Sequence, residues 1–84
     1  MFYVYVLRSA SDGQNYTGCT DDLRGRLALH NLGKVPSTKQ RRPLDLIYYE
    51  ACLNEHDAFR REKYLKTAYG KRYIKSRCRN YFTG

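Results

Sequence analysis

Two short apolar runs close to the N-terminus, separated by a turn, constrain the fold of this chain most strongly. Residues 2–8 are mostly aromatic or aliphatic, which is typical of a β-strand, and residues 15–19 form a second such run. The Asp12-Gly13 pair between them is a strong hairpin signal, because glycine tolerates the backbone conformations that a tight turn needs. We therefore predict a β-hairpin. Gly18, inside its second strand, predicts a bulge or a close approach by another backbone or a ligand.

A helix is predicted directly after the hairpin. Residues 20–22 offer a hydroxyl and two carboxylates, which are the groups that cap a helix N-terminus and favour its positive end. Leu23, Leu27 and Leu32 would face the core, and Gly33 would end the helix.

The second half of the chain predicts a loop, a third strand and more helix. Residues 34–43 hold two prolines and four cations and are typical of a loop, whereas residues 44–52 form a third apolar run. Asn54 begins the next helix as its cap. We expect Gly70 to break or bend that helix, with residues 71–79 as a short basic continuation.

Chain length and composition limit the organisation. The 84 residues leave room for one core, so we expect a single domain over residues 1–84 of the α/β (α+β) class, in the order β-β-α-β-α-α. The sequence has no run of about 20 apolar residues and no signal peptide, so we expect no membrane contact and a cytoplasmic location. Three cysteines without a metal-binding spacing are expected to be reduced, buried thiols.

The chain is strongly basic. Its net charge is +8, and nine of its sixteen Lys and Arg residues lie between residues 60 and 79. Such a field attracts polyanions, but it is equally consistent with a solvated surface that keeps the protein soluble. The cations that we expect to contact nucleic acid are Lys39, Arg41, Arg42, Lys66 and Lys71.

Glu62 is the most unusual residue of the second predicted helix. It shares a stripe with Ala58 and Tyr69, where an ionised carboxylate is costly unless a cation or metal compensates it. Three explanations are open: a structural salt bridge to Arg26, a divalent cation shared with water and phosphate oxygens, or exposure of the stripe edge. The neighbouring cations, Lys66 among them, can lie in solvent and need not be its partners.

Four other polar residues carry potential chemistry. Arg26 and His30 lie one turn apart on the first predicted helix and share a face, where Arg26 could clamp a phosphate or simply lie on the surface. Tyr5 and Tyr16 lie on the two hairpin strands, which could bring both phenols to the same end of the sheet. A phenol is protonated at neutral pH, so a tyrosine general base needs nearby cations, which Arg26 and a metal at Glu62 would provide.

These residues together resemble the GIY-YIG nuclease domain, in its short stand-alone bacterial form. The resemblance rests on two tripeptides, Tyr3-Val4-Tyr5 and Tyr16-Thr17-Gly18, followed by Arg26, His30 and Glu62, and it covers nearly the whole chain. The Gly-Ile of the family name is replaced by Tyr-Val, and the second Ile by Thr, but both tyrosines and the glycine are kept. Many members have a late asparagine; Asn80 is the one candidate here, and it is given no role.

The resemblance implies a small three-stranded antiparallel sheet flanked by helices, and hydrolysis of one DNA strand with one divalent metal, Mg²⁺ or Mn²⁺. By matching position, Tyr5 would be the general base, and Tyr16 would orient the water or contact the phosphate. Arg26 would stabilise the pentacovalent phosphate, and His30 would assist positioning or proton transfer. Glu62 would hold the metal that stabilises the leaving 3′ oxygen.

We therefore predict a metal-dependent DNA endonuclease or nickase, with Gly18 as a structural glycine that permits a close backbone approach. The DNA could be branched or damaged, and RNA is an open alternative. A second hypothesis is a non-catalytic nucleic-acid-binding module that keeps the nuclease fold, and a third is a subunit of a DNA-repair assembly that needs a partner.

Overall fold

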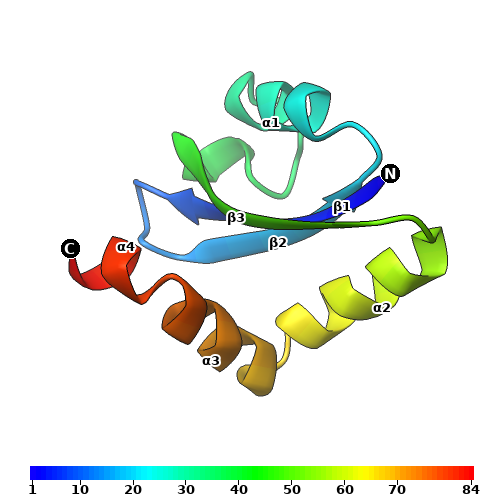
Figure 1. The fold of residues 1–84 in the computed structure, drawn as a ribbon. Coiled ribbons are helices and arrows are strands. Elements are labelled where there is room, and N and C mark those ends of the chain that lie inside the picture. Colours follow the sequence, from blue (N-terminus) through cyan, green and yellow to red (C-terminus); the bar gives the residue numbers. More distant parts are fainter.

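A three-stranded antiparallel sheet with strand order β2-β1-β3 is the centre of the computed structural model, which describes residues 1–84 (Figure 1). Its strands are β1 (Phe2–Ser9), β2 (Asn15–Thr20) and β3 (Leu44–Cys52). Gly13 in the hairpin turn has a φ of 69°, a left-handed conformation that glycine adopts without steric cost. The predicted hairpin is therefore confirmed, and the outer edges of β2 and β3 are both free of a neighbouring strand.

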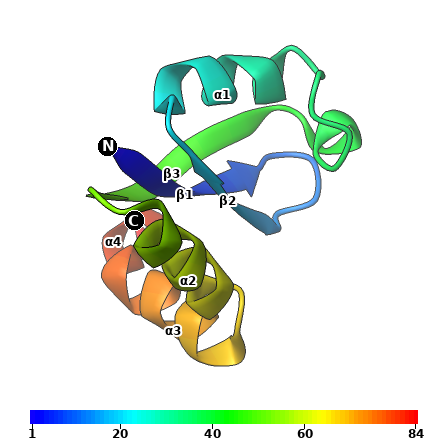
Figure 2. The same cartoon turned by 90° about the vertical axis from the view of Figure 1, so that its right-hand side faces the viewer.

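Helices cover both faces of the sheet (Figures 1 and 2). Helix α1 (Leu23–Asn31) lies on one face, and α2 (Glu55–Leu65), α3 (Ala68–Arg77) and α4 (Arg79–Thr83) lie on the other. The α+β class and the predicted order of elements are confirmed, with α4 as an additional short helix. A 3-10 turn, η1 (Lys39–Arg41), lies within the predicted loop. None of the helices has the length and apolar character that crossing a membrane would require.

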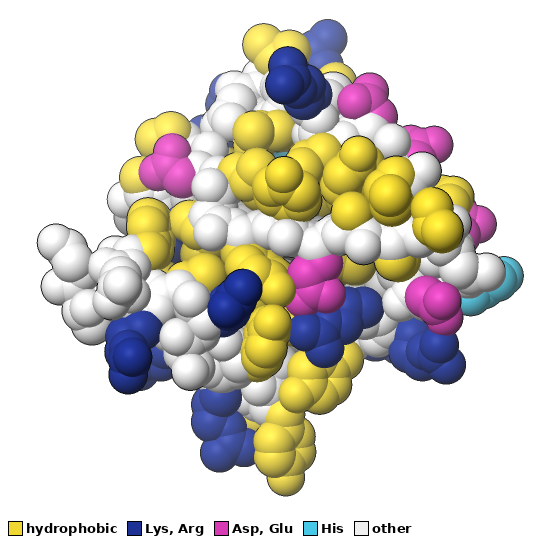
Figure 3. Space-filling model, viewed as in Figure 1, with side chains coloured by type: hydrophobic (Ala, Val, Ile, Leu, Met, Phe, Trp, Pro, Cys, Tyr) yellow, Lys and Arg dark blue, Asp and Glu magenta, His cyan; other side chains and the backbone are white.

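Alternation along β1 creates two cores, because successive side chains of a strand point to opposite faces. Val4 and Val6 point toward α2 and α3, and Tyr5 and Leu7 point toward α1. Burying each of these aliphatic side chains contributes roughly 1.5–3 kcal/mol. On the face shown in Figure 3, hydrophobic side chains form a band across the middle, while Lys and Arg side chains gather over the helices below it.

The predicted helix starts are set by side-chain caps. Asp22 Oδ1 accepts a hydrogen bond from the Gly25 backbone N–H at 3.1 Å, and Asn54 Oδ1 accepts one from the Asp57 N–H at 3.1 Å. Such caps typically contribute about 1 kcal/mol each. Gly33, with a φ of 77°, follows the end of α1 as expected.

The predicted break at Gly70 is wrong in position. Helix α2 ends at Leu65, and Thr67 caps α3, its Oγ1 accepting from the Gly70 N–H at 3.2 Å. A Cβ atom on Gly70 would overlap the backbone of Leu65 and Tyr64, so this glycine lets the first turn of α3 pack against the end of α2. Tyr69 consequently lies on α3, is 69 % exposed and does not share a stripe with Glu62.

A polar cluster attaches α2 and α3 to β3. Arg61 donates two parallel hydrogen bonds to Glu50, Nε to Oε1 and Nη2 to Oε2, both at 2.9 Å. Tyr48 donates to Glu50 Oε2 at 2.9 Å and lies 3.1 Å from the Tyr73 hydroxyl. Burial alone would raise the pKa of Glu50, but Arg61 beside it brings that pKa below its ordinary value. Of the tyrosines near the C-terminus, Tyr73 thus packs the helices onto the sheet.

The three cysteines are free thiols, as predicted, although they are half-buried rather than fully buried. Burial raises the pKa of Cys19 and Cys78, which keeps these thiols protonated and poorly nucleophilic.

Substituting Gly70 by alanine tests the helix junction, because the two relevant effects have opposite signs. Helix propensity alone would make Gly70→Ala stabilising by up to about 1 kcal/mol. The overlap with the end of α2 should instead lower the free energy of unfolding by about 1–3 kcal/mol. Urea unfolding followed by circular dichroism measures the sign, and a stabilised variant would contradict the packing described for α2 and α3.

Candidate active site and nucleic-acid interface

A buried hydrogen-bond chain joins β1, α1 and the segment before η1. The Tyr5 hydroxyl lies 2.9 Å from His30 Nε2, and His30 Nδ1 lies 2.7 Å from Thr38 Oγ1. All three residues are at most 1 % exposed. Thr38 in turn donates toward the Val35 carbonyl at 3.5 Å, so its oxygen is free to accept from His30 Nδ1–H. This assigns Nε2 as the acceptor of the Tyr5 proton.

Electrostatics favour the same assignment of protons. Burial lowers the pKa of His30, and the positive charge of Arg26 lowers it further. Burial also raises the pKa of Tyr5, and the nearby Arg26 opposes that rise without cancelling it. The resting pair is thus a neutral imidazole and a protonated phenol. Arg26 alone therefore does not make Tyr5 a ready phenolate, because burial outweighs its effect on the pKa of Tyr5.

Tyr16 and Arg26 complete the group on this face of the sheet. The Tyr16 ring lies 5.1 Å from the His30 ring and 6.4 Å from the Tyr5 ring, measured between centroids. The Arg26 guanidinium lies beside both phenols. Its interaction with Tyr5 raises the pKa of Arg26, and burial, the next largest effect, lowers this pKa without cancelling the rise. Arg26 also lines a surface hollow of about 300 Å³. Four of the five predicted catalytic residues therefore converge.

Gly18 has a specific packing role. It pairs with Tyr5 across the hairpin, and a Cβ atom at this position would overlap the Tyr5 phenol ring. The close approach predicted from this glycine is thus made by a side chain of the protein, and the β1–β2 register runs without a bulge. The one register irregularity of the sheet lies between β1 and β3 and was not predicted.

Glu62 approaches the group from α2, on the other face of the sheet. Its side chain is 22 % exposed, and its Oε2 lies 3.2 Å from Lys66 Nζ. The salt bridge to Arg26, one of the three open explanations, is therefore not formed; Lys66, one helical turn away and largely exposed, makes the ion pair instead. Burial is the main cause of the raised pKa of Tyr5, and the charge of Glu62 makes a smaller contribution. Burial also raises the pKa of Cys19, and the charge of Glu62 is the second cause there.

The donor set at Glu62 is compatible with one divalent cation. The ion pair engages Oε2 and leaves Oε1 available as a ligand. No group of three or more His, Cys, Asp or Glu residues is clustered tightly enough to hold a metal alone. A single carboxylate suits Mg²⁺, which is commonly bound by one or two carboxylates together with phosphate oxygens and water. The residues therefore fit a cation whose other ligands come from a substrate.

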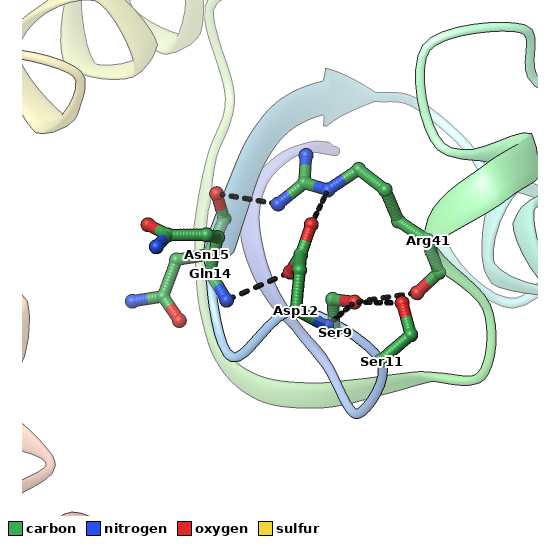
Figure 4. Close-up of polar contacts among 6 residues, drawn as sticks. All are labelled: Ser9, Ser11, Asp12, Gln14, Asn15 and Arg41. Atoms are coloured by element: carbon green, nitrogen blue, oxygen red, sulfur yellow. Dashed lines mark hydrogen bonds and ion pairs between the residues drawn. The ribbon is translucent and has the colours of Figure 1, made fainter.

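The predicted basic residues fall into two groups. In the first group, Arg41 Nε donates to Asp12 Oδ2 at 3.0 Å, and Arg41 Nη2 donates to the Asn15 carbonyl at 3.3 Å (Figure 4). Arg41 thus ties η1 to the hairpin, and Arg42 Nε donates to the Lys39 carbonyl at 2.9 Å. The first group therefore includes structural contacts that the sequence did not indicate.

The second group, Lys66 and Lys71, lines a groove of about 720 Å³ between the hairpin and the α2–α3 junction. Asn15, which Arg41 contacts, lines the same groove. Arg41 and the two groove lysines thus all lie beside the hairpin.

Thr38 is the residue of this site that sequence reasoning missed. It lies eight residues after His30 in a segment predicted as a loop, and no spacing rule links a threonine there to a helical histidine. Only the folded chain brings its hydroxyl to Nδ1.

The fold and this residue set define a class of protein. Residues 1–77 match the family described as the GIY-YIG catalytic domain, and the chain belongs to that family. The domain points to nuclease chemistry and to nucleic acid as a partner.

Small bacterial proteins are the relatives of this chain. It is 46% identical over 66 residues to a UPF0213 protein from Lacticaseibacillus paracasei, covering 77% of this chain and 73% of the relative. It is 43% identical over 77 residues to a UPF0213 protein from Pediococcus acidilactici, covering 88% and 78%, respectively. A UPF0213 protein from Staphylococcus haemolyticus is 42% identical over 66 residues, covering 77% and 79%. No solved structure matches the chain.

Removing the Thr38 hydroxyl should destabilise the fold. Thr38→Val keeps the volume but leaves the buried His30 Nδ1–H without an acceptor, so we expect the free energy of unfolding to fall by about 1–3 kcal/mol. Thr38→Ser keeps the hydroxyl and should lose less. Urea unfolding of the three proteins measures the difference, and equal stability of the valine variant and the wild type would refute the assigned hydrogen bond.

His30 should remain neutral when the solution becomes mildly acidic. Its pKa in the folded state is lowered by burial and by Arg26, so the unfolded chain takes up a proton first as the pH falls below about 6.5. Stability should therefore decrease on acidification, by at most about 1.4 kcal/mol per pH unit from this group. The imidazole chemical shifts of His30 in an NMR titration give its midpoint directly. A midpoint at or above the ordinary histidine value would contradict the buried, neutral state.

Proposed function

We propose that this chain is a metal-dependent DNA endonuclease, or nickase, acting as a single domain over residues 1–84 at the free edge of β2. The observation that carries the proposal is the convergence of Tyr5, Tyr16 and His30 beside the Arg26 guanidinium, with ring centroids 5.1–6.4 Å apart. Protonated phenols, a neutral imidazole and a guanidinium in one place suit proton transfer next to an anionic phosphate.

Tyr5 and His30 act together as the base. A water oxygen attacks phosphorus and gives its proton to the Tyr5 oxygen, while the original Tyr5 proton passes along the 2.9 Å hydrogen bond to His30 Nε2. The bond from phosphorus to the 3′ oxygen breaks, leaving a 5′ phosphate and a 3′ oxygen that takes a proton from solvent. Routing the proton to the imidazole removes the need for a free phenolate, which the raised pKa of Tyr5 disfavours.

Arg26 and Tyr16 hold the phosphate. Arg26 is positioned to donate to two oxygens of the pentacovalent phosphate, where charge accumulates during the reaction. The Tyr16 ring lies 5.1 Å from the His30 ring, and its hydroxyl orients the attacking water or contacts the same phosphate.

Glu62 holds the cation. Its Oε1 would be the ligand, because the ion pair with Lys66 engages the other carboxylate oxygen. When bound there, Mg²⁺ or Mn²⁺ supplies charge stabilisation to the leaving 3′ oxygen. The proposed substrate is DNA, branched or damaged, in the cytoplasm. The alternatives are that RNA is the substrate, or that a repair protein is needed as a partner. Cleavage assays on DNA and RNA, with and without such a partner, distinguish these alternatives.

Cleavage assays with matched variants test this function. We expect wild-type protein to nick supercoiled plasmid or branched DNA with Mg²⁺ or Mn²⁺ and not with EDTA. Tyr5→Phe, Arg26→Ala and Glu62→Gln should each reduce the rate by about 100-fold or more. Arg77→Ala, which removes an exposed charge on α3, is the control and should cleave normally.

Two results would overturn the proposal. Equal cleavage by the wild type and all three site variants would identify a contaminating nuclease. Steeply salt-dependent DNA binding without cleavage in any metal would favour a non-catalytic binding module instead.

A further inference from the structure

The groove beside the hairpin is separate from the proton-transfer group. It has a volume of about 720 Å³ and lies on the α2–α3 side of the sheet, bounded by the hairpin and the α2–α3 junction. Its floor is apolar, formed in part by Val6, Leu65 and Ile74, each of which is at most 3 % exposed. A hollow lined by both apolar and polar side chains suits a ligand that has an apolar part as well as charge.

The rim of the groove is basic, and Lys66 is the one of its cations that is paired with an acid, Glu62. Arg8, Lys66, Lys71 and Lys75 line it, and no Asp or Glu is among its lining residues. Lys71 and Lys75 are exposed and lie one turn apart on α3, so their side chains follow one line along the rim. The rim is therefore complementary to a polyanion, and the floor is complementary to something uncharged.

Phe82 supplies an aromatic surface at one end. It is half-buried at the edge of the apolar core, and the Arg8 guanidinium lies over its ring at 5.1 Å from the centroid. Aromatic rings and guanidinium planes are the surfaces on which nucleic-acid bases stack in proteins that bind single strands.

The groove and the candidate active site share two residues at their border. Tyr16 lines it, and the Tyr16 ring lies 5.1 Å from that of His30. Lys66 also lines it and forms the ion pair with Glu62. A DNA strand with one phosphate beside Tyr16 and Glu62 would therefore continue into the groove.

We infer that this groove holds an unpaired nucleotide of the cleaved DNA strand, next to the scissile phosphate. The inference rests on the proposed function and adds its substrate class: single-stranded DNA, or DNA with an unpaired segment at the cut. A paired base keeps its faces against its neighbours in the stack and cannot reach the apolar floor or Phe82. Only an unstacked base can, while Lys71 and Lys75 contact its flanking phosphates.

Binding without metal tests the inference independently of catalysis. Fluorescently labelled DNAs of one sequence, as single strand, perfect duplex and duplex with an unpaired bulge, are titrated in EDTA and followed by anisotropy. Charge alone would favour the duplex, which has the higher charge density. We expect the opposite order, with single-stranded and bulged DNA bound about tenfold more tightly than the perfect duplex.

Variants locate the effect. Phe82→Leu keeps apolar volume but removes the ring, and should weaken single-strand binding about fivefold or more while leaving duplex binding unchanged. Lys71→Ala/Lys75→Ala should weaken single-strand binding and reduce its salt dependence. The control, Arg72→Ala/Arg77→Ala, removes the same charge from the same helix outside the groove and should keep the preference for unpaired DNA. If Phe82→Leu does not fold, as judged by circular dichroism, the lysine variant and its control carry the test.

The outcomes separate this inference from the nuclease proposal. The proposed role of the groove would be overturned by duplex binding as tight as, or tighter than, single-strand binding. It would also be overturned if the lysine variant and its control lost the same affinity for single strands. Either result would count even if the protein cleaves DNA. If the protein binds unpaired DNA selectively, loses this selectivity in the groove variants and cleaves no DNA, the role of the groove is supported and the endonuclease proposal is overturned.

Discussion

The buried chain of hydrogen bonds from Tyr5 through His30 to Thr38 is the constraint on which the rest of this structure depends. Buried polar groups must be paired, and here each member satisfies its neighbour. The chain fixes how α1 sits over the sheet, because His30 must reach Tyr5, and it fixes the course of the following segment, because Thr38 must reach His30. Gly18 completes the arrangement by making room for the Tyr5 ring. The same contacts that hold one face of the fold together thus define its candidate chemistry.

The site draws on both layers of the molecule because β2 is an edge strand. Tyr5, Tyr16, Arg26 and His30 belong to the α1 side, whereas Glu62 comes from α2 on the opposite side. In a central strand these two groups would be separated by the sheet itself. At a free edge a substrate can contact both, so the position of β2 in the strand order is as important to the proposed reaction as the residues on it.

Local chemistry explains which features could be predicted from the sequence. The strands, the hairpin turn and the caps at Asp22 and Asn54 depend on residues close together in the chain, and they were predicted correctly. The helix junction was misplaced because the role of Gly70 comes from the approach of α2 and not from its own flexibility. Thr38 and the Lys66 partner of Glu62 were missed for a related reason: side-chain reach and solvent exposure are decided by tertiary packing. We expected the two tyrosines to converge with Arg26 and His30 because these residues together resemble the GIY-YIG domain, although no single one of them indicates it.

The ion pair between Arg61 and Glu50 has a consequence for the residue that follows it in the chain. Arg61 and Glu62 are consecutive on α2, so their side chains leave the helix about 100° apart. Arg61 is held to β3 by two parallel hydrogen bonds, and the charge of Glu62 acts on Cys19 of β2. Turning α2 about its axis would pull the Arg61 guanidinium off the Glu50 carboxylate and away from the Tyr73 ring of α3. The contact of Arg61 with β3 therefore limits rotation of α2 and fixes the direction in which the Glu62 side chain leaves the helix.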